Sequence, residues 1–283
     1  MGRNFMTRYK VLMALFLIGM LITGGLLLYY GKGYLDDRKD ADNIREIAYG
    51  KNQAEHASST DPLSDSEEES GAIKEQELSI DFAALIEKNS DTVGWLFACG
   101  GLIDGPIVQT TDNDFYLNHR FDKSYGSVGC FFADAMLPGA ISEAPLTVIY
   151  GHNRKDGSMF RPLLNYKDEA YFLENPTFTI YTEKGAITYQ IFSAFFADNN
   201  DIYGDAFQKL ISDSNEISSK DSESGSESKD MYEDDNLRSL IQEAKEKSLY
   251  ECMKEIPDGD LVILSTCEYS GANNRMVVYG IHK

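Results

Sequence analysis

The chain has 283 residues and a formal net charge of −20, which suits one sizeable domain with appendages or two small domains. This acidic balance argues against nucleic acid as a partner, because phosphate binding requires clustered lysine and arginine. Four cysteines without CxxC spacing give no zinc signature and no disulfide framework, and the four histidines are too scattered to suggest a metal site.

A membrane-spanning helix is predicted over residues 11–30, after a basic N-terminus at residues 1–10. The segment holds twenty consecutive uncharged, mainly apolar residues, and about 1.5 Å of rise per residue spans a hydrocarbon core of about 30 Å. Arg3, Arg8 and Lys10 precede it, so the positive-inside rule predicts a cytoplasmic N-terminus and an extracellular remainder. A cleavable signal peptide is the alternative, but its apolar core would have only about 7 to 15 residues.

Residues 31–78 are predicted to form an acidic polar tether. Their content of Asp, Glu, Ser and Lys cannot bury enough apolar surface for folding, except in a short helix around Ile44 to Tyr49. We therefore expect the folded domain to occupy residues 79–283. The residues up to Gly71 should then be dispensable for its folding.

The expected domain begins with a helix over residues 80–86 and continues as a series of short strands. Apolar segments bounded by glycine, proline and aspartate recur at intervals of about ten residues. The predicted strands are 93–97, 105–109, 115–117, 127–133, 145–150, 177–181, 187–196, 261–264 and 276–281. Such spacing is typical of a closed or sandwich-like β domain.

An acidic insertion interrupts the strand series at residues 212–235. It consists almost entirely of Ser, Asp, Glu, Lys and Gly, which predicts a disordered surface loop. The next segment, residues 236–255, has apolar residues at helical spacing, including Leu240 and Ala244. This pattern predicts an amphipathic helix packed on the sheet.

The chemistry is predicted at the ends of two strands. The apolar run 261–264 leads to Cys267, and Arg275 starts the returning strand of a predicted hairpin. A nearby guanidinium favours the nucleophilic thiolate and can also hold an oxyanion. His152 follows strand 145–150 and is a plausible proton acceptor and donor for the thiol. Taken alone, Cys267 is equally consistent with a buried packing cysteine.

Several short motifs occur in a fixed order along the domain. They are Pro-Ile-Val-Gln at 106–109, Asp-Asn-Asp-Phe-Tyr-Leu-Asn at 112–118, Tyr-Gly-His-Asn at 150–153, Asp-Gly-Ser-Met-Phe at 156–160, Ile-Phe-Ser at 191–193 and Leu-Ser-Thr-Cys-Glu at 264–268. In this order the chain resembles a class B sortase, a membrane-anchored cysteine transpeptidase of Gram-positive bacteria. The resemblance implies a mainly β fold, a closed eight-stranded barrel with flanking helices, preceded by one transmembrane helix.

The resemblance also implies the site. His152 and Cys267 should lie on neighbouring strand ends with Arg275 beside them. The substrate groove is expected to be lined by six residues: Asn113, Leu117, Tyr203, Ser265, Thr266 and Glu268. Two positions depart from the family pattern, where Ile263 and Asn199 stand in place of threonine. The second departure leaves the preferred sorting motif open.

The implied activity is transpeptidation at the outer face of the membrane, without metal or organic cofactor. Cys267 would cleave a C-terminal sorting signal of a secreted protein through a thioacyl-enzyme, while Arg275 stabilises the oxyanion and His152 protonates the leaving amine. An amine of a peptidoglycan stem or cross-bridge, or a pilin lysine, would then take the acyl group. The alternatives are a thiol peptidase that releases product to water and a non-catalytic surface module built on the barrel.

Overall fold

The computed structural model describes most of the chain, in two compact units. The described residues are 2–50, 79–136, 140–141, 143–198, 234–251, 253, 255–267 and 274–282. The two units are Met1–Ile44 and Arg45–Lys283. Most of the predicted tether and the acidic insertion up to residue 233 therefore lie outside the described residues.

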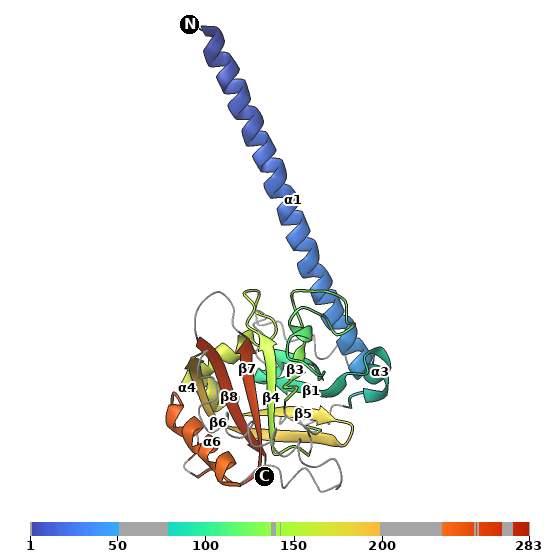
Figure 1. Ribbon diagram of the computed structural model, residues 1–283, viewed down its shortest axis with the longest axis vertical. Coiled ribbons are helices and arrows are strands. Elements are labelled where there is room, and N and C mark those ends of the chain that lie inside the picture. Colours follow the sequence, from blue (N-terminus) through green and yellow to red (C-terminus); the bar gives the residue numbers. More distant parts are fainter. Residues whose placement is uncertain are drawn as a thin grey trace, which may run out of the picture. The chain divides into compact units, whose positions relative to one another are not determined.

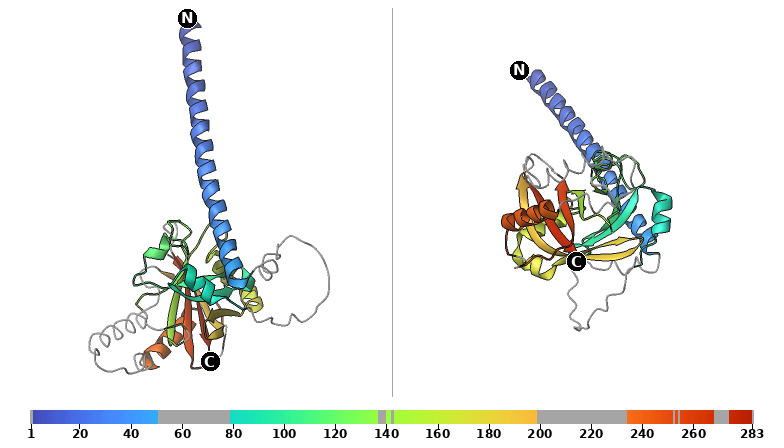
Figure 2. Two further views of the ribbon diagram at one scale, coloured as in Figure 1. Left: turned by 90° about the vertical axis from the view of Figure 1, so that its right-hand side faces the viewer. Right: turned by 60° about the horizontal axis from the view of Figure 1, so that its bottom comes forward.

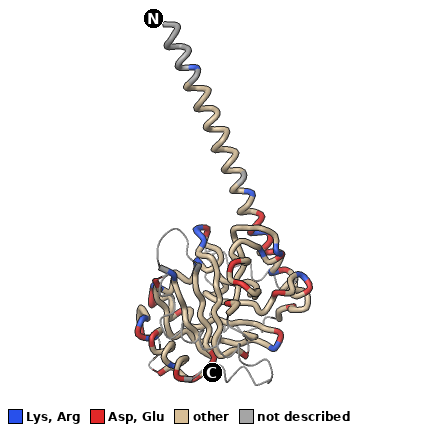
Figure 3. Tube along the Cα trace, in the orientation of Figure 1, with Lys and Arg blue, Asp and Glu red and all other residues tan. Residues whose placement is uncertain are grey.

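The predicted membrane span lies within a single long helix, α1 (Gly2–Tyr49) (Figure 1). Its most apolar window has a mean hydropathy of 2.3, and the helix is long and apolar enough to cross a membrane. Figure 3 shows that lysine and arginine flank a stretch of α1 without charged residues. The helix runs on to Tyr49, so the short helix expected around residues 44–49 is its C-terminal end.

In the second unit, eight strands close into one barrel (Figures 1 and 2). Their order around the barrel is β1-β2-β3-β4-β7-β8-β6-β5. The strands are β1 (Thr92–Ala98), β2 (Ile103–Val108), β3 (Phe131–Ala133), β4 (Leu146–His152), β5 (Thr177–Thr182), β6 (Gly185–Asp198), β7 (Asp260–Cys267) and β8 (Asn274–His282). The pairs β2–β3 and β4–β7 are parallel, and the other pairs are antiparallel. The predicted closed eight-stranded barrel is confirmed.

Two strand predictions differ from the structure. Residues 115–117 form a 3-10 turn, η2 (Phe115–Leu117), because Asp112 accepts hydrogen bonds from the backbone N–H groups of Asp114 and Phe115 at 2.8 and 2.7 Å. The strand predicted over 127–133 begins only at Phe131, the first residue of β3. Gly129 has a φ of +65°, which is incompatible with a pleated strand.

Short helices flank the barrel. They are α3 (Phe82–Lys88), η1 (Cys99–Gly101), η3 (Arg161–Lys167), α4 (Glu169–Glu174) and α6 (Asp234–Lys247). The predicted helix 236–255 thus ends eight residues early. Leu249 instead donates its backbone N–H to the carbonyl of Ala194 in β6 at 2.9 Å. This hydrogen bond ties the chain after α6 to the barrel wall.

The apolar run of β7 is buried on both faces of the sheet, which explains its continuity. Val262 and Leu264 belong to one hydrophobic cluster with residues of most other strands. Leu261 and Ile263 alternate with them and belong to a second cluster, which includes Leu240 of α6. The predicted amphipathic helix therefore packs on the barrel wall.

A buried carboxylate ties the last turn of α1 to the barrel. The Asp104 side chain in β2 is 5% exposed, and Arg45 Nε lies 3.3 Å from its carboxylate. Trp95 Nε1 donates to the same carboxylate at 2.8 Å, and the Tyr49 hydroxyl also donates to it. Burial raises the pKa of Asp104, and these three partners oppose that rise by stabilising the charged form. The second unit therefore starts at Arg45, earlier than the expected start near Ser79.

These contacts predict that the two possible truncations behave differently. A chain starting at Arg45 should keep the barrel's stability, whereas a chain starting at Ala72 loses two partners of Asp104. Removing one side of a buried charged pair costs about 3 to 5 kcal/mol, so the shorter chain should lose about 3 kcal/mol or more. Guanidinium unfolding of both chains measures the difference.

Tyr49→Phe in the longer chain provides the control, because it removes only the hydroxyl and should cost about 1 kcal/mol. Equal unfolding midpoints for both truncated chains would show that the α1 turn contributes nothing to the barrel.

Candidate active site

The structure brings the predicted nucleophile and the predicted acid–base residue together through strand register. β4 and β7 pair in parallel, and the α-carbons of His152 and Cys267 are partners in the last pair of that ladder (Figure 1). Parallel strands end at the same edge of a sheet, so both residues lie at one end of the barrel. The backbone of Cys267 is described, whereas its side chain and residues 268–273 are not.

Arg275 joins this end of the barrel from β8. β7 and β8 are antiparallel, and Ser265 pairs with Val277. This is the last pair of the ladder, two residues before Cys267 on β7 and two residues after Arg275 on β8. On its other side, Arg275 pairs with Ala197 of β6. His152, Cys267 and Arg275 therefore occupy three adjacent strands at one end of the barrel.

The hydrogen bond of His152 fixes which ring nitrogen carries the proton. Its Nε2 lies 2.7 Å from the carbonyl oxygen of Leu117. A carbonyl can only accept, so Nε2–H donates, and the neutral ring then carries its acceptor lone pair on Nδ1. Burial lowers the pKa of His152, and the charge of Arg154 lowers it further, while the Leu117 hydrogen bond opposes the shift. The neutral ring is thus favoured at neutral pH, which suits a base.

Two glycines near the site have no room for a side chain, and one of them contacts the histidine. A Cβ on Gly129 would lie 3.2 Å from His152 Cδ2 and 2.6 Å from the carbonyl oxygen of Tyr116. A Cβ on Gly151 would lie 2.8 Å from an atom of the Phe131 ring. Neither position tolerates a side chain without movement of its neighbours. Sequence reasoning assigned no role to either glycine, although Gly151 lies within the Tyr-Gly-His-Asn motif.

Three of the six predicted groove residues have side chains whose hydrogen bonding the structure describes. Asn113 Oδ1 accepts from the backbone N–H of Ala135 at 2.8 Å. Thr266 Oγ1 accepts from the backbone N–H of Met276 at 3.0 Å, so this hydroxyl joins β7 to β8. Ser265 is fully buried, and among the described residues its hydroxyl has no hydrogen-bond partner.

For Leu117, sequence reasoning expected a groove side chain and missed the carbonyl that binds His152. Tyr203 and Glu268 lie outside the described residues. The described groove residues Asn113 and Leu117 share the loop between β2 and β3. This loop is therefore the part of the predicted groove that contacts the histidine directly.

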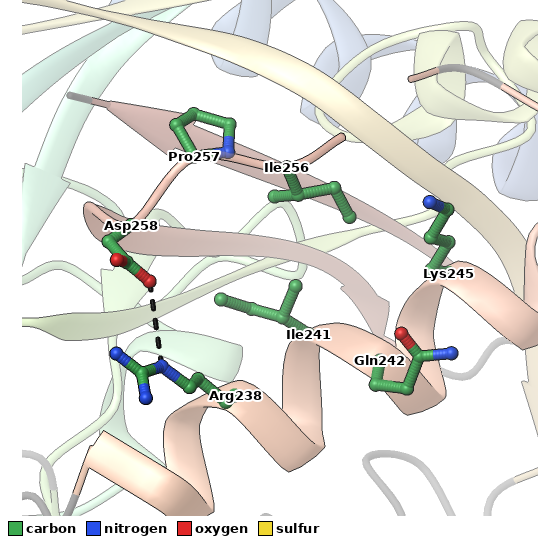
Figure 4. Close-up of a pocket in the computed structure, with 7 residues that line it drawn as sticks. All are labelled: Arg238, Ile241, Gln242, Lys245, Ile256, Pro257 and Asp258. Atoms are coloured by element: carbon green, nitrogen blue, oxygen red, sulfur yellow. Dashed lines mark ion pairs between the residues drawn. The ribbon is translucent and has the colours of Figure 1, made fainter. Parts of the chain in front are cut away.

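A cavity of about 150 Å³ lies elsewhere, between α6 and the segment that leads into β7 (Figure 4). It is lined by Arg238, Ile241, Gln242, Lys245, Ile256, Pro257 and Asp258. Arg238 and Asp258 form a solvent-exposed ion pair across it at 3.6 Å. It contains none of the predicted site residues and no cysteine.

Two known proteins with similar sequences are both sortases B. The chain is 31% identical over 196 residues to sortase B of Listeria monocytogenes, covering 68% of this chain and 70% of that protein. It is 26% identical over 200 residues to sortase B of Staphylococcus aureus, covering 70% and 72%. No family model matches the chain.

Solved structures with a similar fold are also sortases B. Sortase B from Bacillus anthracis is 26% identical with a TM-score of 0.60, covering 89% of this chain and 98% of that one. Sortase B from Listeria monocytogenes is 29% identical with a TM-score of 0.54, covering 70% and 97%. Both similarities extend over nearly the whole of the solved chains.

The surroundings of His152 predict a lowered pKa that depends on Arg154. Titration followed by the ring NMR signals should give a pKa below the ordinary 6.5. Arg154→Gln should raise this pKa by removing a nearby positive charge, whereas Lys155→Gln, in the exposed neighbouring position, should leave it unchanged. A pKa at or above 6.5 in the unsubstituted chain would contradict the burial argument.

The lowered pKa of His152 also predicts how the free energy of unfolding changes with pH. Because the folded state favours neutral His152, its contribution to stability is present above about pH 6.5. It should decline as the pH falls from that value toward the lowered pKa. Unfolding curves of the unsubstituted chain and of His152→Gln should therefore converge on acidification.

Proposed function

The chain belongs to the sortase B family of cysteine transpeptidases, and on that premise we propose that it joins secreted proteins to an amine of the cell wall. The substrate would carry a C-terminal sorting signal. The observation that best supports this proposal is the parallel register that pairs His152 with Cys267. A nucleophile and a base on paired strand ends are held at fixed spacing, which nucleophilic catalysis requires.

The first half-reaction forms the thioacyl-enzyme. His152 Nδ1 takes the thiol proton of Cys267, and the sulfur attacks the carbonyl carbon of the scissile peptide bond. Arg275 stabilises the negative charge that develops on the carbonyl oxygen. The C–N bond then breaks, and His152 returns its proton to the leaving amine. The histidine thus ends this step neutral, as it began.

The second half-reaction transfers the acyl group. An amine of a peptidoglycan stem or cross-bridge, or a pilin lysine, attacks the thioester carbonyl while His152 takes the amine proton. The C–S bond breaks, and the proton passes back to the sulfur of Cys267. One amide bond has replaced another, so neither an oxidant nor a reductant is consumed.

We place the sorting signal in a groove beside these residues. The contact of Leu117 with His152 supports a groove wall formed by Leu117 and Asn113. The Thr266 hydroxyl accepts from the backbone N–H of Met276, so its side chain would contact substrate only through its remaining O–H donor. Roles for Ser265, Tyr203 and Glu268 rest on the family resemblance.

The apolar part of α1 supports a place for this reaction at the membrane. We propose that residues 11–30 span the bilayer, with the basic N-terminus in the cytoplasm and the barrel outside the cell. In that position the barrel would meet secreted proteins as they emerge. The same position would give access to amines of the cell wall.

Substitution of the three residues should separate their roles. Cys267→Ala should abolish turnover of a sorting peptide, because it removes the proposed nucleophile. His152→Ala and Arg275→Ala should each lower kcat/KM by at least about a hundredfold, which acid–base catalysis and an oxyanion donor typically supply. Steady-state kinetics with a peptide and an amine acceptor measure both effects.

Arg275→Lys provides the matched control, since lysine keeps the charge but lacks the planar fork of donors. It should restore less than a tenth of the activity. Near-normal activity of Arg275→Ala would remove the arginine from the mechanism.

Acyl transfer is distinguished from hydrolysis by its dependence on the acceptor. With a sorting peptide alone, product release should be slow, and adding a cell-wall amine should accelerate it and yield the ligated peptide. Chromatography with mass detection resolves ligated from hydrolysed product. A hydrolysis rate that the amine does not change would identify a thiol peptidase instead.

A further inference from the structure

We propose that Tyr116 and Asn89 are positioning residues for His152, acting through the backbone carbonyl of Leu117. The inference rests on the proposed role of His152 as the acid–base residue. It concerns a buried polar network outside the three reacting side chains. The network connects α3 and the start of β1 with the loop that follows β2.

The carbonyl that binds His152 belongs to a turn with two further anchors. Leu117 is the last residue of η2, and its neighbour Tyr116 accepts a backbone hydrogen bond from Cys130 at 3.0 Å. The carbonyls of Tyr116 and Leu117, which are consecutive in this turn, therefore bind the residue before β3 and the ring of His152. A rotation of this turn would move the Leu117 oxygen away from Nε2.

The Tyr116 side chain fixes that turn through two hydrogen bonds of its hydroxyl group. Tyr116 is 2% exposed, and its hydroxyl donates to Asp91 Oδ2 at 2.8 Å. The same hydroxyl accepts from Asn89 Nδ2 at 2.8 Å. Lys123 pairs with Asp91 at 2.9 Å, so the acceptor of the tyrosine is itself fixed. Donor and acceptor together leave the tyrosine ring one orientation.

Asn89 completes the network and is buried to the same extent as Tyr116. Its Nδ2 also donates to the carbonyl of Phe121 at 2.8 Å, and its Oδ1 accepts from the backbone N–H of Asp91 at 3.0 Å. Burying an amide is costly unless its hydrogen bonds are made, so a complete set specifies one loop conformation. Phe121 and Tyr116 lie in the same loop, which Asn89 thus holds at two points.

Gly129 lies beside the contact between the Leu117 carbonyl and His152. With a φ of +65°, it approaches the carbonyl oxygens of Tyr116 and Leu117 and the ring of His152. A methyl group there would lie 3.1 Å from the Leu117 oxygen. The absence of a side chain at Gly129 therefore leaves room for the ring edge that donates to Leu117.

The charged groups around the histidine do not explain its orientation. Arg154 acts on its charge, and Asp156 pairs with that arginine at 2.8 Å. Cys267 ends the adjacent strand β7, and Arg275 starts β8 beyond it. The Leu117 carbonyl can only accept a hydrogen bond from Nε2, and this contact selects the tautomer.

The test reads the tautomer directly. Long-range proton–nitrogen NMR of the full chain in detergent micelles distinguishes Nε2–H from Nδ1–H, and the spectrum of His152→Ala identifies the His152 signals. The unsubstituted chain should show the Nε2–H tautomer alone. A predominant Nδ1–H form would overturn the proposal without any further variant.

Tyr116→Phe should then give mixed tautomers and a kcat lowered by about ten- to a hundredfold, with the KM for peptide changed less than about twofold. Tyr166→Phe is the matched control, because its buried hydroxyl donates to the carbonyl of Asn175 at 2.9 Å and touches no part of this network. It should keep the tautomer and kcat of the unsubstituted chain.

A Tyr116→Phe chain with the original tautomer, or with unchanged kcat, would overturn the proposal. Should that chain fail to fold, Asn89→Ala tests the same network, with the same two outcomes. Failure of the proposed transpeptidase function is distinguishable from failure of this proposal. A chain without transpeptidase activity would still show the His152 tautomer by NMR.

Discussion

The parallel pairing of β4 with β7 is the interaction on which the site depends. It places the ends of two buried strands side by side and so makes His152 and Cys267 partners. The apolar residues along β7 are buried on both faces, which resists slippage of this register. A one-residue shift would move either residue to the opposite face of the barrel wall.

The elements around this pair reduce its freedom further. β8 brings Arg275 to the same end of the barrel. The Thr266 side chain links β7 to Met276, the residue after Arg275 in β8. The loop after β2 contributes the carbonyl that orients His152. The geometry of the site is thus set by the paired strands together with hydrogen bonds from buried side chains such as Thr266 and Tyr116.

Local sequence patterns predicted much of the fold, and long-range contacts account for the errors. Apolar runs identified β7 and β8, but the side chain of Asp112 converts residues 115–117 into a turn. The end of α1 docks through Tyr49 and Asp104, which are far apart in the sequence and show no periodic pattern. Strand ends and family motifs indicated the site residues. The Leu117 carbonyl has no side-chain signature, so no sequence pattern could predict it.

The proposed mechanism requires Cys267 to carry the acyl group between the two half-reactions. Intact-mass spectrometry of the chain, quenched with acid after mixing with a sorting peptide and no amine, detects this intermediate. We expect a mass increase equal to the N-terminal peptide fragment, located on Cys267 by digestion and absent in Cys267→Ala. An adduct on Cys99 or Cys130, or turnover without any adduct, would rule out Cys267 as the carrier.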